Sequence, residues 1–374
     1  STMARRRETD IHNQPIDPER RTLLAAAGAG VLAATFGGAA TAQSPKTLRW
    51  GVVGTGGIAN SMAPRIKQAG HAELAAVSSR RMKTAEEYAE KHSVPKAFDS
   101  WADMLAWDGV DAVYIATPTS VREEISVAAA KAGKHVLGEK PFANLPSLQR
   151  ITQACRDNGV GFMDGTHFPH HPRTAQIQSV MADRVGWPWS VASAFQFGLT
   201  DLNNIRMRPD LEPYGAIGDA GWYNMRAAAE YMPQDLKIAS VDAYLRRGET
   251  GAAVSGSGVI VFEDGSTTTW NCGFESGAGI MDLRISGAKG VIKLDDFLSQ
   301  RREDNAGVYE YRSGWRDREN VVIASDKPGA ALMFQDFASM VESSEWREAS
   351  IAVSERTQYL LDAIWNSAVE NERA

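Results

Sequence analysis

A glycine-rich turn follows a short apolar segment near residue 50. The segment Leu48–Val53 runs into Gly54-Thr55-Gly56-Gly57-Ile58-Ala59, which has the spacing Gly-x-Gly-x-x-Ala and precedes a helical pattern. Glycine at position 54 permits a tight turn, and glycine at position 56 leaves room for a pyrophosphate against the backbone. The pyrophosphate then lies on free N–H groups at a helix N-terminus, where the dipole favours an anion. The spacing therefore predicts a dinucleotide-binding turn, with the cofactor at Gly54, Gly56, Gly57 and Ile58.

The end of the second predicted strand indicates which dinucleotide fits. A carboxylate at that corner would bind a ribose 2′-OH, but the sequence reads Ser78-Ser79-Arg80-Arg81, with Lys83 close behind. Small hydroxyl groups and guanidinium groups suit a 2′-phosphate, because arginine binds phosphate through two parallel hydrogen bonds. We therefore predict NADP, with Ser79, Arg80 and Lys83 at its adenosine end. The alternative is that these cations are solvated surface charges.

The first half of the chain alternates strand-like and helical segments. Strands are predicted at 48–53, 73–78, 111–117, 135–138 and 160–163, and helices at 58–69, 84–92, 101–106, 122–132 and 146–157. Such alternation is typical of an α/β fold with a doubly wound parallel sheet.

After about residue 166 the pattern changes to period-2 segments. Strands are predicted at 190–197, 238–245, 258–262, 267–272, 281–286, 291–294 and 308–311, and helices at 174–181, 219–232, 331–341 and 353–369. Glu263-Asp264-Gly265 indicates a hairpin turn. These segments predict an α+β domain with a large, mostly antiparallel, open sheet. We therefore divide the chain into a leader (1–42), a dinucleotide-binding Rossmann domain (43–166) and a substrate and oligomerisation domain (167–374).

The leader resembles an export signal. Ser1-Thr2 ahead of Met3 resembles a cloning scar, and Arg20-Arg21 precedes an Ala/Gly-rich apolar run that ends in Ala40-Thr41-Ala42. Paired arginines before such a run resemble a twin-arginine signal, and small-x-small fits a cleavage site. The run is too rich in Ala and Gly for a membrane span. We expect a periplasmic protein that is exported folded; the alternative is a buried Ala-rich helix behind a disordered tail.

Composition narrows the function classes. The 374 residues carry a formal net charge of −6, with 43% hydrophobic and 23% charged residues. These values are ordinary for a soluble globular protein and disfavour nucleic acid as a partner. Two cysteines, Cys155 and Cys272, allow at most one disulfide, and we expect both to be reduced and structural.

Several other chemistries find no support. His167, His170 and His171 lie close together, but Pro169 and Pro172 prevent a helical ligand face, so no metal is expected. The sequence has no Gly-x-Ser-x-Gly elbow and no phosphate loop of the Gly-x4-Gly-Lys-Ser/Thr type, which argues against a hydrolase or a kinase.

Four motifs together resemble the Gfo/Idh/MocA oxidoreductases. They are the glycine turn, Thr117-Pro118, Glu139-Lys140-Pro141 and Gly218-Asp219-Ala220-Gly221-Trp222-Tyr223, which matches the family's Asp-x-x-x-Tyr helix. The resemblance covers nearly all of residues 46–370. The stretch 164–173 is similar to the branch of dihydrodiol dehydrogenases and their sugar-oxidising relatives. With an export signal, the nearest functional likeness is to the periplasmic glucose–fructose and aldose–aldose oxidoreductases.

The resemblance implies a catalytic set of Lys140, Asp219 and Tyr223. Oxidation of a sugar hydroxyl needs a base, and a nearby ammonium would lower the pKa of tyrosine from about 10. Asp219 lies one helical turn before Tyr223, hence on the same face, and by resemblance binds the sugar or holds Lys140. The resemblance places Thr117, Pro118, Glu139 and Lys140 at the cofactor. Taken singly, Tyr223 could be a half-buried aromatic, Asp219 a helix cap and Lys140 a surface residue.

The substrate region is less defined. We expect His167 or Arg173 to line a sugar pocket beside Asp219, and Trp187-Pro188-Trp189 to pack the domain junction rather than stack on a sugar. An open sheet in the second domain would be covered by another subunit, which predicts a homodimer or homotetramer.

The predicted function is oxidation of an aldose at C1 to the lactone by tightly bound NADP, which a second sugar regenerates. This prediction combines the expected periplasmic location with the family resemblance, because free NADP is not expected outside the cytosol. Tight binding predicts extra contacts from 43–47 or 331–341. One alternative is an NADP-dependent dihydrodiol or anhydro-sugar dehydrogenase with an exchangeable cofactor. Another is a non-catalytic protein that binds NADP or a sugar.

Overall fold

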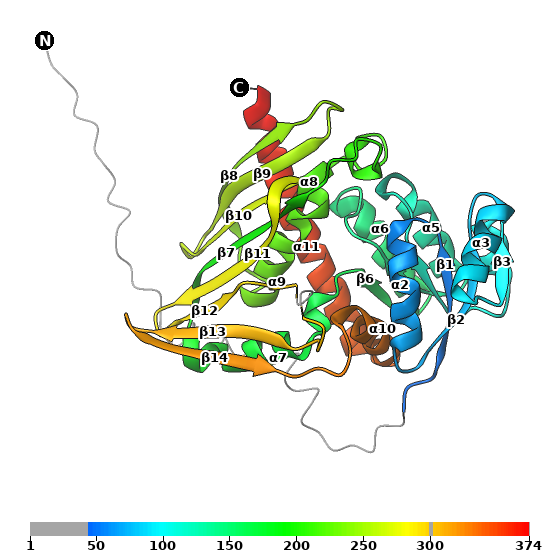
Figure 1. Ribbon diagram of the computed structural model, residues 1–374, viewed down its shortest axis with the longest axis horizontal. Helices are drawn as coiled ribbons and strands as arrows, with labels where there is room; N and C mark the ends of the chain where they lie inside the picture. Colours follow the sequence, from blue (N-terminus) through cyan, green and yellow to red (C-terminus); the bar gives the residue numbers. More distant parts are fainter. Residues whose placement is uncertain (1–43, 299–301, 374) are drawn as a thin grey trace, which may run out of the picture.

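The computed structural model describes residues 44–298 and 302–373. Two sheets, one parallel and one mostly antiparallel, lie on either side of a group of helices (Figure 1). The predicted leader lies outside the described residues. Within the described ranges, no helix is both long enough and apolar enough to cross a membrane.

The first sheet has six parallel strands in the order β3-β2-β1-β4-β5-β6. The strands are β1 (Leu48–Val53), β2 (Ala72–Ser78), β3 (Lys96–Phe98), β4 (Ala112–Ile115), β5 (His135–Gly138) and β6 (Phe162–Asp164). The helices between them are α2 (Gly57–Gln68), α3 (Met82–His92), α4 (Trp101–Ala106), α5 (Thr119–Lys131) and α6 (Leu145–Asp157). The predicted parallel α/β sheet is confirmed; the three-residue strand β3 was not predicted, because it is too short to show a pattern.

The second sheet has eight strands in the order β14-β13-β12-β11-β7-β10-β9-β8. They are β7 (Pro188–Gly198), β8 (Ile238–Arg247), β9 (Ala253–Phe262), β10 (Thr267–Gly273), β11 (Glu275–Gly287), β12 (Val291–Leu294), β13 (Gly307–Ser313) and β14 (Asp317–Ile323). Neighbours pair antiparallel except β7 and β10, which run parallel. The predicted mostly antiparallel sheet is confirmed. β14 was not predicted, because most of its residues are exposed and its first three are charged.

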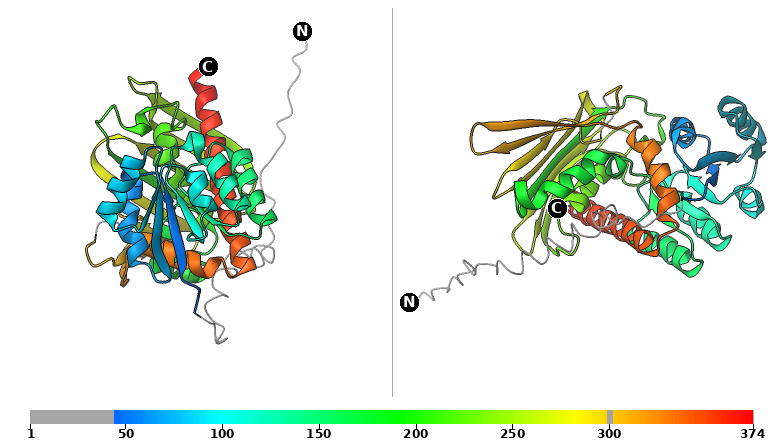
Figure 2. Two further views of the ribbon diagram at one scale, coloured as in Figure 1. Left: turned by 90° about the vertical axis from the view of Figure 1, so that its right-hand side faces the viewer. Right: turned by 90° about the horizontal axis from the view of Figure 1, so that it is seen from below.

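The helices of the second half connect the two sheets. They are η1 (Phe168–His170), α7 (Pro172–Val180), η2 (Met181–Val185), η3 (Ile205–Met207), α8 (Gly215–Asp219), α9 (Gly221–Tyr231), α10 (Gly329–Met340) and α11 (Ser344–Arg373). α11 packs on β8 and α9 as well as on β6 and α6, so it joins both halves (Figure 2). The predicted single helix 219–232 is wrong: the helical segment begins at Gly215 and divides into α8 and α9 at Ala220.

The core of the parallel sheet needs a helix from the end of the chain. Trp50 on β1 is fully buried, and its ring centroid lies 5.0 Å from that of Phe334 and 4.8 Å from that of Phe337. Both phenylalanines belong to α10, which also packs on α2. Burying such aromatic side chains stabilises the fold by about 1.5–3 kcal/mol each, so α10 is an integral layer of the dinucleotide-binding half.

His135, the first residue of β5, makes folding sensitive to acid. Its Nδ1 accepts a hydrogen bond from the Gly161 N–H at 2.9 Å, and burial lowers its pKa to about 4. The unfolded chain has a histidine pKa near 6.5, so it binds more protons than the folded protein between pH 6.5 and 4. The contribution of His135 to stability is therefore complete above pH 6.5 and is lost as the pH falls toward 4.

We expect His135→Asn to reduce this acid sensitivity, because Asn Oδ1 can accept the Gly161 hydrogen bond without titrating. Urea unfolding at pH 7 and pH 5 should show that wild type loses about 1–2 kcal/mol more stability between the two than the variant. Equal losses of stability in wild type and variant would contradict the assignment of this acid sensitivity to His135.

Candidate active site

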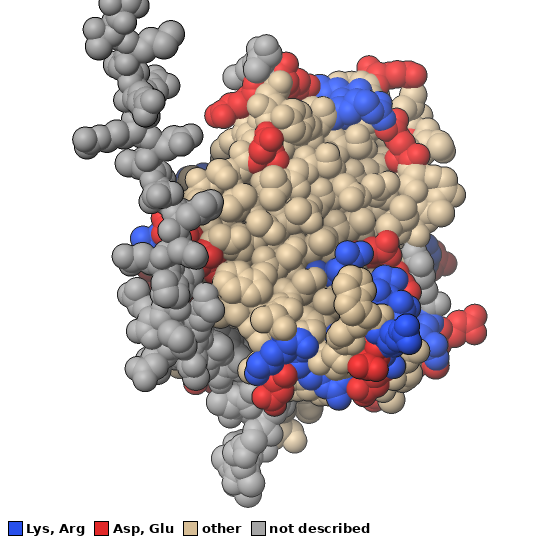
Figure 3. Space-filling model, turned by 90° about the vertical axis from the view of Figure 1, so that its left-hand side faces the viewer, with Lys and Arg blue, Asp and Glu red and all other residues tan. Residues whose placement is uncertain are grey.

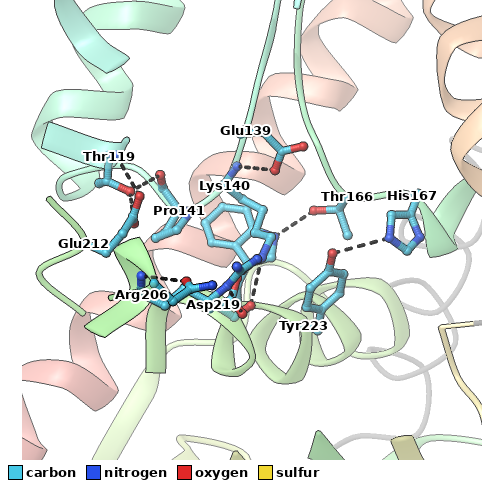
Figure 4. Close-up of polar contacts among 12 residues, drawn as sticks. Thr119, Glu139, Lys140, Pro141, Thr166, His167, Arg206, Glu212, Asp219 and Tyr223 are labelled. Atoms are coloured by element: carbon cyan, nitrogen blue, oxygen red, sulfur yellow. Dashed lines mark hydrogen bonds and ion pairs between the residues drawn. The ribbon is translucent and has the colours of Figure 1, made fainter. Parts of the chain in front are cut away.

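The chemistry-bearing residues lie at the carboxyl ends of β1, β4, β5 and β6. Parallel strands end at one edge of the sheet, so Gly54, Thr117, Glu139 and Asp164 come together there. Ligands of open α/β sheets bind outside this edge. α8 and α9 bring Asp219 and Tyr223 to the same edge (Figure 4).

The glycine turn after β1 fits a dinucleotide. Gly54 has a φ of +98°, and a Cβ there would lie 3.1 Å from the Ala116 carbonyl oxygen, so only glycine is tolerated without strain. A Cβ built on Gly56 or Gly57 meets no atom of the described residues within 4 Å, which leaves space in front of the α2 N-terminus. Among described side chains none caps this helix, so its N–H groups can bind an anion.

Two further observations agree with a cofactor at this turn. The Thr117 Oγ1 atom, just after β4, is buried and finds no hydrogen-bond partner within the described ranges. Ile58, in the first turn of α2, is 38% exposed. A dinucleotide would give the hydroxyl a partner and cover the isoleucine. Pro118, the N-cap residue of α5, follows Thr117 directly.

The corner after β2 carries hydroxyl and guanidinium groups. Ser79 Oγ lies 2.6 Å from Thr84 Oγ1 and 3.4 Å from Thr55 Oγ1, which ties this corner to the glycine turn. Arg80 is exposed. Lys83, in the first turn of α3, is exposed, and its Nζ lies 3.9 Å from Glu87 Oε1; its role at the cofactor stays a prediction.

Glu139 and Lys140 form a turn that a buried arginine holds in place. The Glu139 carboxylate accepts a hydrogen bond from the Tyr114 hydroxyl at 2.6 Å, and burial raises its pKa although Lys140 opposes this. Arg122 donates to the Pro141 and Thr117 carbonyl oxygens, so it joins the turns after β4 and β5. The Lys140–Pro141 peptide is cis. Sequence reasoning missed Arg122, whose place in a helix gave no signal.

Lys140 and Arg206 share the carboxylate of Asp219. Lys140 Nζ donates to the Asp219 main-chain oxygen at 2.9 Å and to Oδ1 at 3.1 Å. Arg206 Nε lies 2.8 Å from Oδ2. Burial alone would raise the pKa of Asp219, but the two cations outweigh it and lower that pKa, so the carboxylate is ionised. The structure thus brings Lys140 to Asp219, and Arg206 is a site residue that sequence reasoning missed.

Tyr223 lies beside this ion cluster in a buried position. Lys140 Nζ lies 4.6 Å from the centroid of the tyrosine ring, and the hydroxyl lies 3.4 Å from His167 Nε2. Burial lowers the pKa of His167 to about 4, and the Lys140 charge adds to this, so the imidazole is neutral at pH 7. His167 therefore lies at the site.

The expectation that Lys140 lowers the pKa of Tyr223 is wrong. The ammonium faces the ring rather than the hydroxyl, and burial raises the pKa of Tyr223 well above its usual value, with Glu139 and Asp219 adding to the rise. The tyrosine is therefore neutral at pH 7, and its ring packs edge-on against that of Phe195 with 5.4 Å between the centroids.

Arg173 does not reach this site. Its guanidinium is buried and donates to the main-chain oxygens of Asp296, Phe297 and Val308 at 2.9, 2.7 and 3.1 Å. The side chain therefore anchors β13 to α7. The expectation that Arg173 lines a sugar pocket is wrong, because these carbonyl groups already use its donors.

The other singled-out residues have structural partners. His170 Nδ1 pairs with Asp336 Oδ2 at 2.7 Å, and within the described ranges no group of three or more His, Cys, Asp or Glu is placed to hold a metal. Trp187 Nε1 donates to Asp264 Oδ2 at 2.9 Å, in the turn between β9 and β10, so this contact lies within the second domain and not at the expected domain junction. Cys155 and Cys272 are buried and free, and burial raises both pKa values to about 12, as expected for structural thiols.

Residues 44–47 lie at the opposite edge of the parallel sheet. The Lys46 N–H donates to Glu342 Oε1 at 2.9 Å, and Lys46 Nζ lies 3.3 Å from Asp111 Oδ1. This segment enters the amino end of β1, a strand length of about 15–20 Å from Gly54. The predicted contact between these described residues and the cofactor is therefore wrong.

A parallel sheet with such a turn, next to a lysine, a carboxylate and a tyrosine, defines a dinucleotide-dependent oxidoreductase. Residues 48–166 match the model of the oxidoreductase family with an NAD-binding Rossmann fold, GFO_IDH_MocA. The chain is 32% identical over 232 residues to D-xylose 1-dehydrogenase (NADP(+)) 2 of Haloferax volcanii, covering 61% of this chain and 70% of that one.

Two solved structures are similar along nearly their whole length. The 3-ketoreductase of Actinomadura kijaniata, in complex with NADP and TDP-benzene, has a TM-score of 0.77 and 27% identity, and the alignment covers 86% of this chain and 98% of that one. The aldose-aldose oxidoreductase of Caulobacter crescentus, complexed with glycerol, has a TM-score of 0.78 at 20% identity, which shows the fold, over 87% and 98% of the chains. The protein belongs to the Gfo/Idh/MocA oxidoreductase family.

We expect Gly56→Ala to prevent dinucleotide binding without unfolding the protein. A methyl group at this position meets open space in the protein, so the melting temperature should stay within a few degrees, but it would occupy the pyrophosphate's path. Fluorescence titration with NADPH and NADH should show affinity at least about tenfold weaker, the scale of one misplaced methyl group.

Gly277→Ala is the matched control, since a Cβ on this exposed β11 glycine also meets no described atom within 4 Å. Unchanged affinity in Gly56→Ala would place the cofactor elsewhere.

Proposed function

We propose that this protein is an NADP-dependent sugar oxidoreductase. The observation that carries the proposal is the Lys140 ammonium, which lies between the Asp219 carboxylate and the Tyr223 ring at the edge where the glycine turn lies. The similarity to a D-xylose 1-dehydrogenase (NADP(+)) supports both sugar and cofactor. The hydroxyl groups of Ser79 and the cation of Arg80, without a carboxylate, support a 2′-phosphate.

The side chains support proton transfer at a sugar oxygen. NADP, when bound, supplies the acceptor for the hydride that leaves a carbinol carbon. During reduction Tyr223 donates its hydroxyl proton to the carbonyl oxygen. During oxidation it first passes that proton to neutral His167 or to solvent, and the resulting phenolate takes the proton of the sugar hydroxyl. Lys140 donates a hydrogen bond to the same oxygen, and Asp219 fixes the ammonium. His167, neutral at pH 7, orients the tyrosine hydroxyl.

More specifically, we propose that two sugars in turn reduce and reoxidise the bound cofactor. One aldose loses the C1 hydrogen as hydride and the C1 hydroxyl proton, which yields a lactone. A second sugar accepts a hydride and a proton at its carbonyl group, which regenerates the oxidised cofactor. The twin-arginine pattern supports a periplasmic location, where a retained NADP makes such a cycle necessary. The alternative with an exchangeable cofactor is a dihydrodiol or anhydro-sugar dehydrogenase.

The first experiment measures NADP(H) released by denaturing the purified protein with no cofactor added. About one equivalent per chain, reduced by one aldose and reoxidised by a second sugar, would support the two-sugar cycle. A cofactor-free protein that turns over with added NADP would overturn retention and favour the exchangeable dehydrogenase. Binding without any turnover would favour the non-catalytic protein.

We expect Tyr223→Phe to lower kcat about 10²–10⁴-fold while NADP content stays unchanged, because only the proton-transferring hydroxyl is lost. The matched control is Tyr244→Phe, at an exposed tyrosine on β8. Steady-state kinetics with a panel of aldoses provide the measurement. Turnover equal to wild type in Tyr223→Phe would contradict the catalytic assignment.

We also propose that the open face of the eight-stranded sheet binds a second copy of the chain in a homodimer or homotetramer. Described helices cover only the opposite face (Figure 2), and the exposed face has a broad area without charged residues (Figure 3). Asp282 and Arg284 lie two residues apart on the same exposed face of β11. A two-fold axis can therefore pair Asp282 of one copy with Arg284 of the other, and the reverse.

A charge introduced at the centre of this face should block association. Light scattering should give a dimer or tetramer mass for wild type and a monomer for Thr269→Arg, because an arginine on β10 would be buried unpaired. Thr250→Arg, in the exposed turn between β8 and β9, is the control. A monomeric wild type would contradict the proposal.

A further inference from the structure

Arg206 reaches the site from a loop that crosses between the two halves of the protein. The loop joins β7 to α8, and Arg206 lies in its 3-10 turn η3, where the Arg206 N–H donates to the side-chain oxygen of Asn204. The far end of the loop is fixed to the N-terminus of α5, the helix that follows β4, because Glu212 accepts from Thr119 N at 3.1 Å and from Thr119 Oγ1 at 2.6 Å. The loop therefore presents Arg206 at a fixed place (Figure 4).

Arg206 and Lys140 each hold one oxygen of the same carboxylate. The arginine lies on Oδ2 of Asp219 at 2.8 Å, and the lysine lies on Oδ1 at 3.1 Å. The Arg206 side chain is 36% exposed but that of Lys140 only 7%, so the arginine closes the cluster at its rim. Without Arg206, Oδ2 would lose its ion-pair partner, and the carboxylate could rotate to take the ammonium on both oxygens.

We propose that Arg206 is a positioning residue: it fixes the Asp219 carboxylate so that Lys140 stays above the Tyr223 ring. The role in catalysis rests on the proposed function, since Lys140 and Tyr223 act there on the sugar oxygen. The arginine acts through Asp219, and its own contact with a substrate is not required.

The charge of Arg206 also affects the tyrosine. The charged or titratable groups near Tyr223 come from β6, α8, η3 and the segments that follow β5 and β6: Glu139, Lys140, Asp164, His167, Arg206 and Asp219. After burial, the carboxylates of Glu139 and Asp219 raise the pKa of Tyr223 most, and Arg206 opposes them. Removal of this cation would therefore make the phenolate still rarer and shift base-dependent turnover to higher pH.

The test compares Arg206→Met and Arg206→Lys with the control Arg208→Met, which removes an exposed arginine of the same loop that pairs with Asp210 at 2.6 Å. Crystal structures of the purified holoproteins come first. We expect the Asp219 carboxylate to rotate and Lys140 Nζ to leave its place above Tyr223 in Arg206→Met, but not in Arg208→Met. A cluster unchanged in Arg206→Met would overturn the proposal.

The second measurement is the pH dependence of kcat with D-xylose and D-glucose. We expect Arg206→Met to lower kcat about 10–100-fold at pH 7 and to move the rise of kcat upward by about one pH unit, which corresponds to 1.36 kcal/mol. Arg206→Lys should restore part of both effects. A fall in kcat by the same factor at every pH would indicate a merely structural role and overturn the proposal. If wild type turns over no sugar, the proposed function fails, but the crystal structures still decide the placement of Lys140.

Discussion

The buried ion pair between Asp164 and Arg226 holds the two halves of the site together. Arg226 Nη1 lies 2.5 Å from Asp164 Oδ2, and the two side chains are 5% and 1% exposed. Charges so deeply buried cost several kcal/mol each unless every oxygen is paired. Here Ser354 of α11 donates to the same carboxylate at 2.5 Å, and Thr166 donates to its other oxygen. The end of β6 is thereby bound to α9, α11 and the segment that carries His167.

This arrangement explains why the candidate site needs both halves of the protein. Trp222, next to Tyr223 on α9, donates its indole N–H to Thr166 Oγ1 at 2.7 Å. This bond fixes the orientation of α9 about its own axis as well as its position. Lys140 comes from the parallel sheet and Asp219 from the other half. Their ion pair, at 7% and 17% exposure, therefore forms only when the halves are docked, and it adds to the same docking.

The sequence predicted those parts of the site that depend on neighbours along the chain. The turn at Gly54 and the residues after β4 and β5 follow from short spacings, because parallel strands end at one edge. Arg122, Arg206 and Arg226 were missed, since an arginine in a helix or loop has no pattern that distinguishes a buried ion pair from a surface charge. Lys140 and Asp219 are 79 residues apart, and only the family resemblance connected them. Arg173 was misplaced because its proximity to His167 in sequence does not make it a neighbour in space.

The placement of Lys140 determines how it affects the protonation of Tyr223. A cation above an aromatic ring interacts with the ring's electron density, whereas a cation at the oxygen would stabilise the phenolate. Lys140 takes the first position, and burial raises the pKa of Tyr223, with the charges of Glu139 and Asp219 adding to the rise, so the tyrosine keeps its proton at pH 7. A neutral tyrosine is poised to donate to a carbonyl oxygen, and oxidation requires that it accept a proton while its own is passed on or lost. Neutral His167, 3.4 Å from the hydroxyl, is placed to take that proton. Lys140, Arg206 and His167 together therefore set how readily Tyr223 gives up or accepts a proton.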